Sequence, residues 1–131
     1  RPFSLLLMDI DHFKKVNDSF GHSRGDVVLQ KLAKILQETA REQDIVARTG
    51  GEEFSILLPE AKKEEAKVMA ERIRETVSKS EMGSQEIEIQ ITISIGVAEI
   101  LPGEDVDAIY NRADLALYRA KAKGRNCVEL D

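Results

Sequence analysis

Apolar residues recur along the chain with two periods, one typical of strands and one typical of helices. Short apolar runs bounded by glycine, proline or acidic residues predict strands at residues 3–9, 45–48, 54–58 and 127–130. Large apolar residues at every second position predict a further strand, long and half-buried, from residue 87 to residue 97. The pattern therefore predicts five strands, and two of them flank a glycine turn as a hairpin.

Apolar residues three and four positions apart predict four helices between these strands. The helices are expected at residues 13–20, at about residues 25–40, around the apolar stripe of residues 66–77 and around that of residues 106–120. The resulting order is βααββαβαβ. This order favours an α+β fold, in which a single mixed sheet of about five strands is covered by helices.

Composition narrows the classes of protein to which the chain can belong. With 131 residues, of which 42% are hydrophobic, the chain can bury the core of one domain. The longest apolar run, residues 5–8, is too short to cross a bilayer, and no signal-peptide pattern opens the chain. The single cysteine, Cys127, cannot form an internal disulfide. We therefore expect a cytoplasmic domain without direct membrane contact, although a longer protein could be tethered to a membrane.

Two acidic clusters stand at the ends of predicted strands. Asp9 and Asp11 follow the first strand, and side chains two residues apart point the same way if the strand persists. Glu52 and Glu53 follow the glycine pair and precede the strand at 54–58. If the two strands are neighbours, Asp9 and Glu52 could form a magnesium site that phosphate and water complete. The alternative is that these carboxylates are solvated acids without a ligand.

Several other kinds of site are excluded. A calcium loop that begins at Asp9 would need an oxygen ligand and a glycine where Phe13 and Lys14 stand. The phosphate, dinucleotide and zinc motifs G-x-x-x-x-G-K, G-x-G-x-x-G and H-E-x-x-H do not occur. The net charge of −5 argues against a nucleic-acid polymer as partner, and it means that a polyphosphate ligand would need metal ions.

Three segments together resemble one known family over nearly the whole chain. They read DIDHFKKVNDSFGHSRGD from residue 9, RTGGEEF from residue 48 and DLALYRAKAKGRN from residue 114. Their order and spacing are similar to those of the GGDEF family of diguanylate cyclases. Glutamate replaces the aspartate of the family's named motif, a GGEEF variant that keeps the carboxylate. The resemblance implies a palm-like mixed sheet and condensation of two GTP molecules into cyclic di-GMP and pyrophosphate.

The resemblance also implies roles for the two acidic clusters. Asp9 and Glu52 match the side-chain ligands of Mg²⁺, for which Mn²⁺ is a possible substitute, and the carbonyl of Ile10 would turn toward a metal. Gly50 and Gly51 would let the backbone and the α-phosphate region approach each other closely. Glu53 would lie near the reacting 3′-hydroxyl. Whether it accepts a proton, orients the hydroxyl or binds a second metal ion stays open.

Two polar residues match the guanine-binding positions of the family. They are Asn17 and Asp26. A carboxylate accepts both the ring N–H and the amino group of guanine, whereas adenine presents an acceptor at the same place. GTP is therefore expected to be preferred over ATP.

A further set matches the positions that bind the triphosphate. Lys121 and Arg125 lie four residues apart, which places them on one side of the last helix if that helix persists. Backbone amides of His12, Phe13 and Lys14 would cradle the terminal phosphates at a helix N-terminus.

A last match concerns control of activity. Arg41 and Asp44, in the stretch REQD, resemble the family's RxxD inhibitory site for cyclic di-GMP, to which Arg72 could add a second guanidinium. No helix of the kind that usually precedes the first strand of the family is present in residues 1–131. We therefore expect a single catalytic domain whose N-terminal helix and upstream sensor are absent. Catalysis would need a homodimer, because each domain binds one GTP.

Two classes of function stay open at this point. One is an active cyclase that works as a transient homodimer, and the other is a binding module of the same fold that has lost turnover. The intact carboxylates Asp9, Glu52 and Glu53 favour the cyclase. A different metal-dependent nucleotidyl transferase is a more remote third class.

Overall fold

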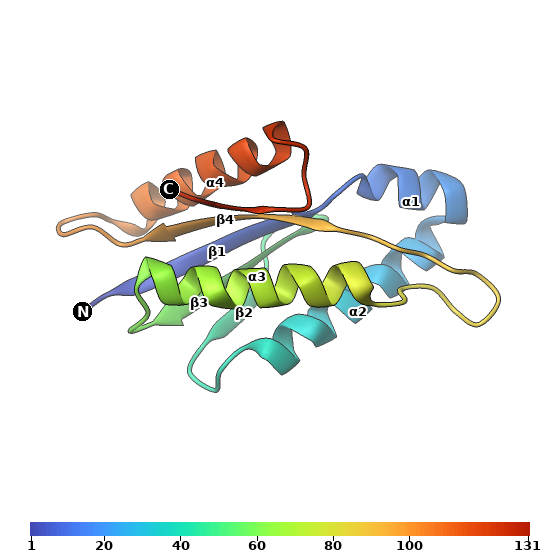
Figure 1. The fold of residues 1–131 in the computed structure, drawn as a ribbon, viewed down its shortest axis with the longest axis horizontal. Coiled ribbons are helices and arrows are strands. Elements are labelled where there is room, and N and C mark those ends of the chain that lie inside the picture. Colours follow the sequence, from blue (N-terminus) through green and yellow to red (C-terminus); the bar gives the residue numbers. More distant parts are fainter.

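A computed structural model describes residues 1–131 and has the predicted element order (Figure 1). The elements are β1 (Phe3–Ile10), α1 (Phe13–Phe20), α2 (His22–Thr39), β2 (Ile45–Arg48), β3 (Glu53–Pro59), α3 (Lys63–Lys79), β4 (Ile93–Glu99), α4 (Val106–Ala122) and β5 (Val128–Leu130). None of the helices combines the length and the apolar character that a membrane span requires.

The five strands form one mixed sheet in the order β2-β3-β1-β4-β5. β1 lies in the centre and pairs antiparallel with both β3 and β4, while β5 runs parallel to β4. β2 and β3 form the predicted antiparallel hairpin. The predicted α+β fold with a single mixed sheet is therefore confirmed. The first strand and the hairpin are neighbours, which is the condition for a site shared by Asp9 and Glu52.

The helices cover the two faces of the sheet unequally. Leu6, Met8 and Ile10 of β1 belong to the larger apolar cluster, which includes the buried residues of α2 and α3. Leu7 belongs to a smaller cluster with residues of α4. Because side chains alternate along a strand, Asp9 lies on the same face as Leu7 and therefore on the α4 side. Figure 1 shows α4 on one side of the strands and α3 on the other.

Close packing of α4 on β4 depends on one glycine. A Cβ atom added at Gly96 would lie 2.2 Å from the carbonyl oxygen of Ala113 and 2.4 Å from the amide nitrogen of Leu117. Both atoms belong to helix backbone, which cannot move aside easily. Gly96 therefore fixes how near α4 can lie to the sheet, and with it the position of every side chain that α4 sends toward the strand ends.

Two boundaries differ most from the prediction. The strand expected at 87–97 begins only at Ile93, which pairs with Ile10, the last residue of β1. The preceding residues have no strand beside them, and their alternation reflects burial of Ile89 and Ile91 in the core rather than sheet pairing. The helix expected from about residue 25 starts at His22, directly after the turn at Gly21, whose φ is 90°.

Candidate functional site

The two acidic clusters meet at one end of the sheet. Asp9 and Glu53 are direct partners in the β1–β3 pairing, and the amide of Ile10 donates to the carbonyl of Glu52 over 3.4 Å. A small pocket of about 170 Å³ opens beside them. It is lined by Asp9, Ile10, Asp11, His12, Phe13, Lys14, Glu52, Lys121 and Arg125. The chain thus brings the predicted metal ligands and the predicted phosphate-binding residues into one pocket.

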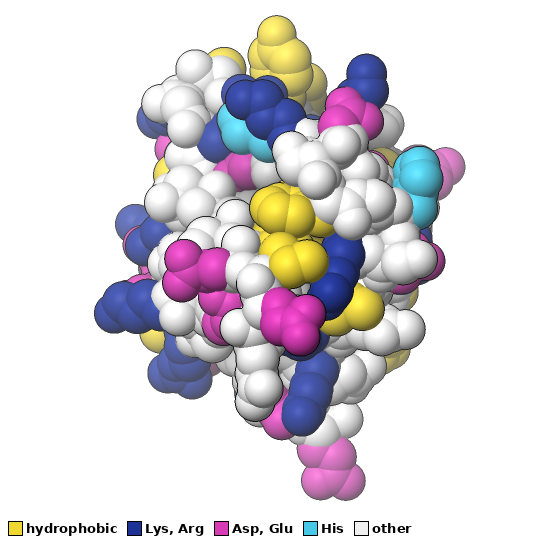
Figure 2. All heavy atoms as spheres, turned by 90° about the vertical axis from the view of Figure 1, so that its right-hand side faces the viewer, with side chains coloured by type: hydrophobic (Ala, Val, Ile, Leu, Met, Phe, Trp, Pro, Cys, Tyr) yellow, Lys and Arg dark blue, Asp and Glu magenta, His cyan; other side chains and the backbone are white.

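This end of the molecule also carries α1, and Figure 2 looks onto it. Hydrophobic side chains are visible near the centre of the view, and acidic, basic and histidine side chains lie around them. His12 precedes α1 with a φ of 55°, and no side chain caps that helix. The first amides of α1 therefore lack an intrahelical partner and are free to donate to a ligand.

Lys121 forms an ion pair with Asp9. The side chains are 34% and 15% exposed, so the pair is partly shielded from water. Arg125 is not on the helix as expected, because α4 ends at Ala122 and Arg125 adopts a φ of 66°. Its amide donates to the carbonyl of Ala120, and this turn brings it to the pocket beside Lys121.

Asp11 has a different role from the one that its spacing suggests. Asp11 lies just beyond the last residue of β1, which ends at Ile10. The Asp11 carboxylate is buried and accepts from the hydroxyls of Thr92 and Ser94 over 2.7 and 2.6 Å. It also accepts from the amide of Asn126 over 2.9 Å. It therefore ties β4 and the turn that carries Arg125 to the end of β1.

The remaining donor set suits a hard cation. No group of three or more His, Cys, Asp or Glu side chains is placed to hold a metal ion by itself. Mg²⁺ does not need one, since it is commonly held by one or two carboxylates together with phosphate oxygens and water. Asp9, Glu52 and the carbonyl of Ile10, all of which line the same pocket, match that requirement.

Glu53 is held by two hydroxyl groups. Thr49 and Tyr110 both donate to its Oε2 over 2.7 Å. The hydrogen bond to Glu53, together with burial, raises the pKa of Tyr110 to about 12, so the phenol keeps its proton at neutral pH. Sequence reasoning missed Tyr110, because it lies 57 residues away from Glu53 and carries no motif of its own.

The glycine turn differs from the simple hairpin that the sequence suggested. Neither Gly50 nor Gly51 has a positive φ. Instead, the Arg48 guanidinium donates to the carbonyls of both glycines, over 3.2 Å to Gly50 and 2.6 Å to Gly51. A Cβ at Gly51 would meet no atom within 4 Å, so the turn presents bare backbone to solvent. Arg48, a second residue that sequence reasoning left without a role, shapes this turn.

A larger pocket of about 400 Å³ lies between α1, α2 and the glycine turn. Asn17 and Asp26, the residues matched to guanine, both line it. Asn17 Oδ1 is buried without any hydrogen-bond partner, the only such side-chain atom in the structure. The Asp26 side chain is exposed and makes no hydrogen bond. The Asp26 carboxylate is therefore an acceptor open to a ligand with N–H groups, whereas Asn17 Oδ1 packs against Gly25, where an added Cβ would lie 1.9 Å from it.

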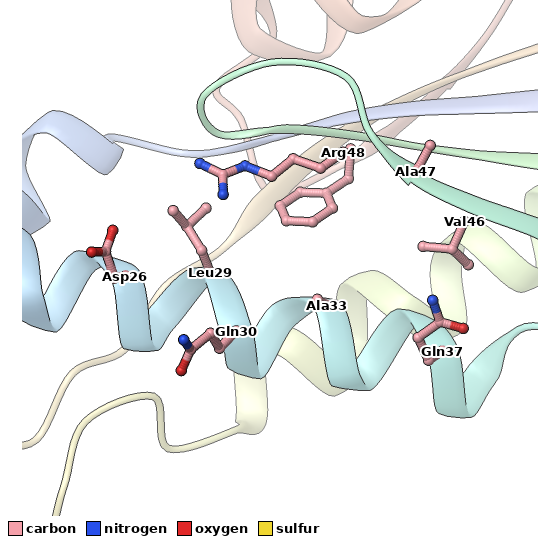
Figure 3. Close-up of a pocket in the computed structure, with 9 residues that line it drawn as sticks. Asp26, Leu29, Gln30, Ala33, Gln37, Val46, Ala47 and Arg48 are labelled. Atoms are coloured by element: carbon pink, nitrogen blue, oxygen red, sulfur yellow. The ribbon is translucent and has the colours of Figure 1, made fainter.

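This pocket continues along α2 into a second cavity of about 440 Å³, drawn in Figure 3. Asp26, Leu29 and Arg48 line both. Figure 3 shows Arg48 extending from the hairpin across the space above α2, with Asp26 on the helix below.

The predicted inhibitory residues lie at the opposite end of β3. Arg41 and Asp44 form an ion pair of 2.7 Å, and the Asp44 side chain is fully buried. Arg41 also donates to the carbonyl of Pro59 over 2.9 Å. The carboxylate hydrogen bond raises the pKa of Arg41. Arg72 is exposed on α3 and makes no hydrogen bond. The structure thus joins Arg41 and Asp44 but gives Arg72 no contact with them.

Comparison with known proteins places the chain in a family. The sequence profile of the family described as "Diguanylate cyclase, GGDEF domain" matches residues 1–127. The chain belongs to the GGDEF family. Diguanylate cyclase DgcM of Escherichia coli (strain K12) is 48% identical over 128 residues, which are 98% of this chain and 30% of that protein. This GGDEF chain spans about 30% of the length of the curated relatives it matches.

Solved structures agree with this placement. The GGDEF domain of DgcB from Caulobacter crescentus, solved in complex with c-di-GMP, is 37% identical with a TM-score of 0.93, covering 98% of this chain and 77% of that one. The active GGEEF domain of a diguanylate cyclase from Vibrio cholerae is 39% identical with a TM-score of 0.93, covering 99% and 83%. The family resemblance drawn from the three motifs is therefore confirmed.

Proposed function

We propose that the chain is the catalytic domain of a diguanylate cyclase, which condenses two GTP molecules into cyclic di-GMP and pyrophosphate. The observation that carries this proposal is the meeting of two sets of residues at one end of the sheet. Asp9, Glu52 and Glu53 lie beside Lys121 and Arg125, and the pocket with the guanine-matched residues adjoins them.

The guanine base binds in the pocket of about 400 Å³ between α1, α2 and the glycine turn. Asn17 lines this pocket, and its side-chain amide hydrogen-bonds to the base once it turns away from Gly25. The carboxylate of Asp26 accepts from the two neighbouring N–H groups of guanine, which adenine cannot offer in the same arrangement. A site built around such acceptors disfavours a base that lacks the donors, so the chain selects GTP over ATP.

The smaller pocket receives the triphosphate. Lys121 and Arg125 line it. The first amides of α1, which have no intrahelical partner, donate to the phosphates at the N-terminus of this helix, where the dipole favours an anion. The chain has a net charge of −5, so these few donors must act at short range against the charge of the rest of the domain.

Mg²⁺, or Mn²⁺ as a substitute, is held by Asp9, Glu52 and the carbonyl of Ile10. The bound ion offsets negative charge on the phosphates during phosphoryl transfer. Glu53 directly follows the proposed ligand Glu52 and is not assigned to the first ion. It accepts the hydrogen of the 3′-hydroxyl that attacks the α-phosphate of the second GTP, and in doing so orients that hydroxyl.

Each domain binds one GTP, so the two new bonds form only when two copies of the chain face each other. The protein therefore works as a homodimer. The part of the relatives that this chain does not cover leaves room for an upstream sensor that controls the pairing. The proposed location is the cytoplasm, where GTP is supplied.

Cyclic di-GMP binds a second site at Arg41 and Asp44 and limits its own synthesis. Asp44, whose side chain is fully buried, holds the guanidinium of Arg41, which is 35% exposed and suits the phosphates and the guanine edges of the product. Arg72 approaches the product from α3 only if the ligand bridges the two elements.

The test is to incubate the chain with GTP and Mg²⁺ and to detect cyclic di-GMP by chromatography. Two forms are compared, the chain alone at high concentration and the chain fused to a parallel dimeric coiled coil. Product from the fused form, and none from its Glu53→Gln variant, supports the proposal. No product from either form, with GTP or cyclic di-GMP bound in calorimetry, overturns the proposed activity in favour of a binding module.

A further inference from the structure

Tyr110 reaches the reaction centre from a rigid support. It lies on α4, half-buried, next to Ile109, which packs in the smaller apolar cluster with Ala113 and Leu117. Because this helix is pressed onto the sheet at Gly96, the tyrosine ring has little freedom to move away. Its phenol lies 2.7 Å from Oε2 of Glu53. The rigid helix α4 thus presents one hydrogen-bond donor, the Tyr110 hydroxyl, to the carboxylate of Glu53, the first residue of β3.

Both donors to Glu53 use the same carboxylate oxygen. Thr49 and Tyr110 each donate to Oε2, and Oε1 has no hydrogen-bond partner in the structure. A carboxylate oxygen that already accepts two hydrogen bonds has little capacity left, whereas its companion oxygen keeps its lone pairs for a ligand. The two hydroxyls therefore decide which oxygen of Glu53 stays available.

Without these donors, Glu53 would have reasons to move. Asp9 is its direct neighbour across the sheet, and two like charges in that arrangement repel each other. Lys121, which pairs with Asp9, would attract a freed Glu53 as well. Asp114 on α4 adds a further negative charge near Tyr110. The hydrogen bond from the Tyr110 hydroxyl on α4 counters these forces, and it requires only that one phenol side chain is ordered.

We propose that Tyr110 is a positioning residue for the cyclase reaction, which holds Glu53 so that Oε1 is free for the reacting 3′-hydroxyl. The proposal rests on the proposed function for its catalytic part, but the hydrogen bond itself does not. Tyr110 touches neither substrate nor metal in this assignment and acts only through Glu53. A purely structural role is the rival explanation, since the ring also packs against the core.

The variant Tyr110→Phe separates the two explanations, because it keeps the ring and removes only the hydroxyl. We expect kcat for cyclic di-GMP formation to fall about tenfold, since a hydrogen bond to a charged group contributes roughly 1.5 kcal/mol. KM for GTP should stay within about twofold, because the pockets for the base and the triphosphate are untouched. The midpoint of thermal unfolding should change little.

Tyr118→Phe is the matched control. Tyr118 lies on the same helix, is 70% exposed and makes no hydrogen bond, so its variant should behave as the parent. Thr49→Val should lower kcat in the same direction as Tyr110→Phe, and the double variant should lose less than the product of the two, because both act on one oxygen. An equal loss of kcat and rise of KM in Tyr110→Phe would assign the residue a structural role and overturn the proposal.

A second readout does not need activity. The carboxyl carbon of Glu53 is observed by NMR in the nucleotide-free chain labelled with carbon-13 glutamate, and its resonance is assigned by its loss in Glu53→Gln. It should shift in Tyr110→Phe and not in Tyr118→Phe. If the parent makes no product, the proposed function fails, and this resonance still decides the hydrogen bond. No shift in Tyr110→Phe overturns the positioning role in either case.

Discussion

Asp9 and Asp11 stand two residues apart at the end of the same strand, yet the fold treats them oppositely. Asp11 is buried and receives three neutral donors, two hydroxyls and one amide. Asp9 is partly exposed and has only the ammonium of Lys121, a group that a phosphate ligand would attract away. Burial, with hydrogen bonds to both oxygens, is typical of a structural carboxylate. A single mobile counter-charge leaves a carboxylate ready for a ligand.

This difference shows why carboxylates in a motif cannot be assigned by residue type. A buried acid that accepts hydrogen bonds at both oxygens stabilises the fold, and the cost of removing it appears in the free energy of unfolding. An acid left for a ligand costs little to remove from the fold and much to remove from the reaction. Substitution of each aspartate in turn separates these two classes of carboxylate.

The largest effect is expected at Asp9. Asp9→Asn should lower the rate of cyclic di-GMP formation about 10³-fold, because a neutral amide is a poor ligand for a divalent cation and the charge of the phosphates is then not offset. The urea midpoint of unfolding should stay near that of the parent. Asp107→Asn, at an exposed acid without an ion pair, serves as control for both measurements. A loss of stability in Asp9→Asn would show that Asp9, like Asp11, is a structural carboxylate.

Asp11 should give the reverse result. Asp11→Ala leaves two hydroxyls and one amide without their acceptor, which we expect to lower the free energy of unfolding by about 3 kcal/mol. Urea titration measures the free energy of unfolding. An unchanged slope of this free energy against urea concentration would show that the unfolded state is the same in the variant. An unaltered free energy of unfolding would show that the buried carboxylate is not what ties β4 to the turn after α4.

A smaller effect tests the counter-charge on Asp9. Lys121→Met should raise the affinity of the nucleotide-free chain for Mn²⁺ about fivefold, because a partly exposed ion pair that competes for the carboxylate contributes about 1 kcal/mol. The affinity for GTP should fall in the same variant. Calorimetry measures both affinities. Lys123→Met, at an exposed lysine that pairs with Glu129 instead, should change neither. Equal metal affinity in both variants would mean that Lys121 does not restrain Asp9.

The smallest effect concerns an acid far from the site. The Arg112 guanidinium lowers the pKa of Glu104 to about 2 in the folded protein from an ordinary 4.5. A lowered pKa means that the pair contributes stability above about pH 4.5, which is lost as the pH falls toward about 2. Glu104→Gln should therefore flatten this part of the profile of unfolding midpoint against pH. Glu38→Gln, at an exposed acid without a partner, should keep the slope of the parent.

Much of the fold was predictable, because periodicity reports burial directly. The bounds of α1 and β2 match the prediction, and the element order is correct throughout. The strand expected at 87–97 was too long for a physical reason. Alternating burial occurs wherever an extended chain lies on a core, whereas a strand also needs a partner, and β1 ends at Ile10. Periodicity in one segment carries no information about where its neighbour ends.

The sequence by itself determined the residue types of the site and their places at strand ends, because the three motifs are local. Only the tertiary structure decided which carboxylate is open and which is satisfied. Lys121 lies 112 residues from Asp9, and the Asn126 amide lies 115 residues from Asp11. The hydroxyl of Tyr110 reaches Glu53 across 57 residues. These donors arrive through the packing of α4 and the turn after it, and the hydrogen bonds of a carboxylate depend on what surrounds it in space rather than along the chain.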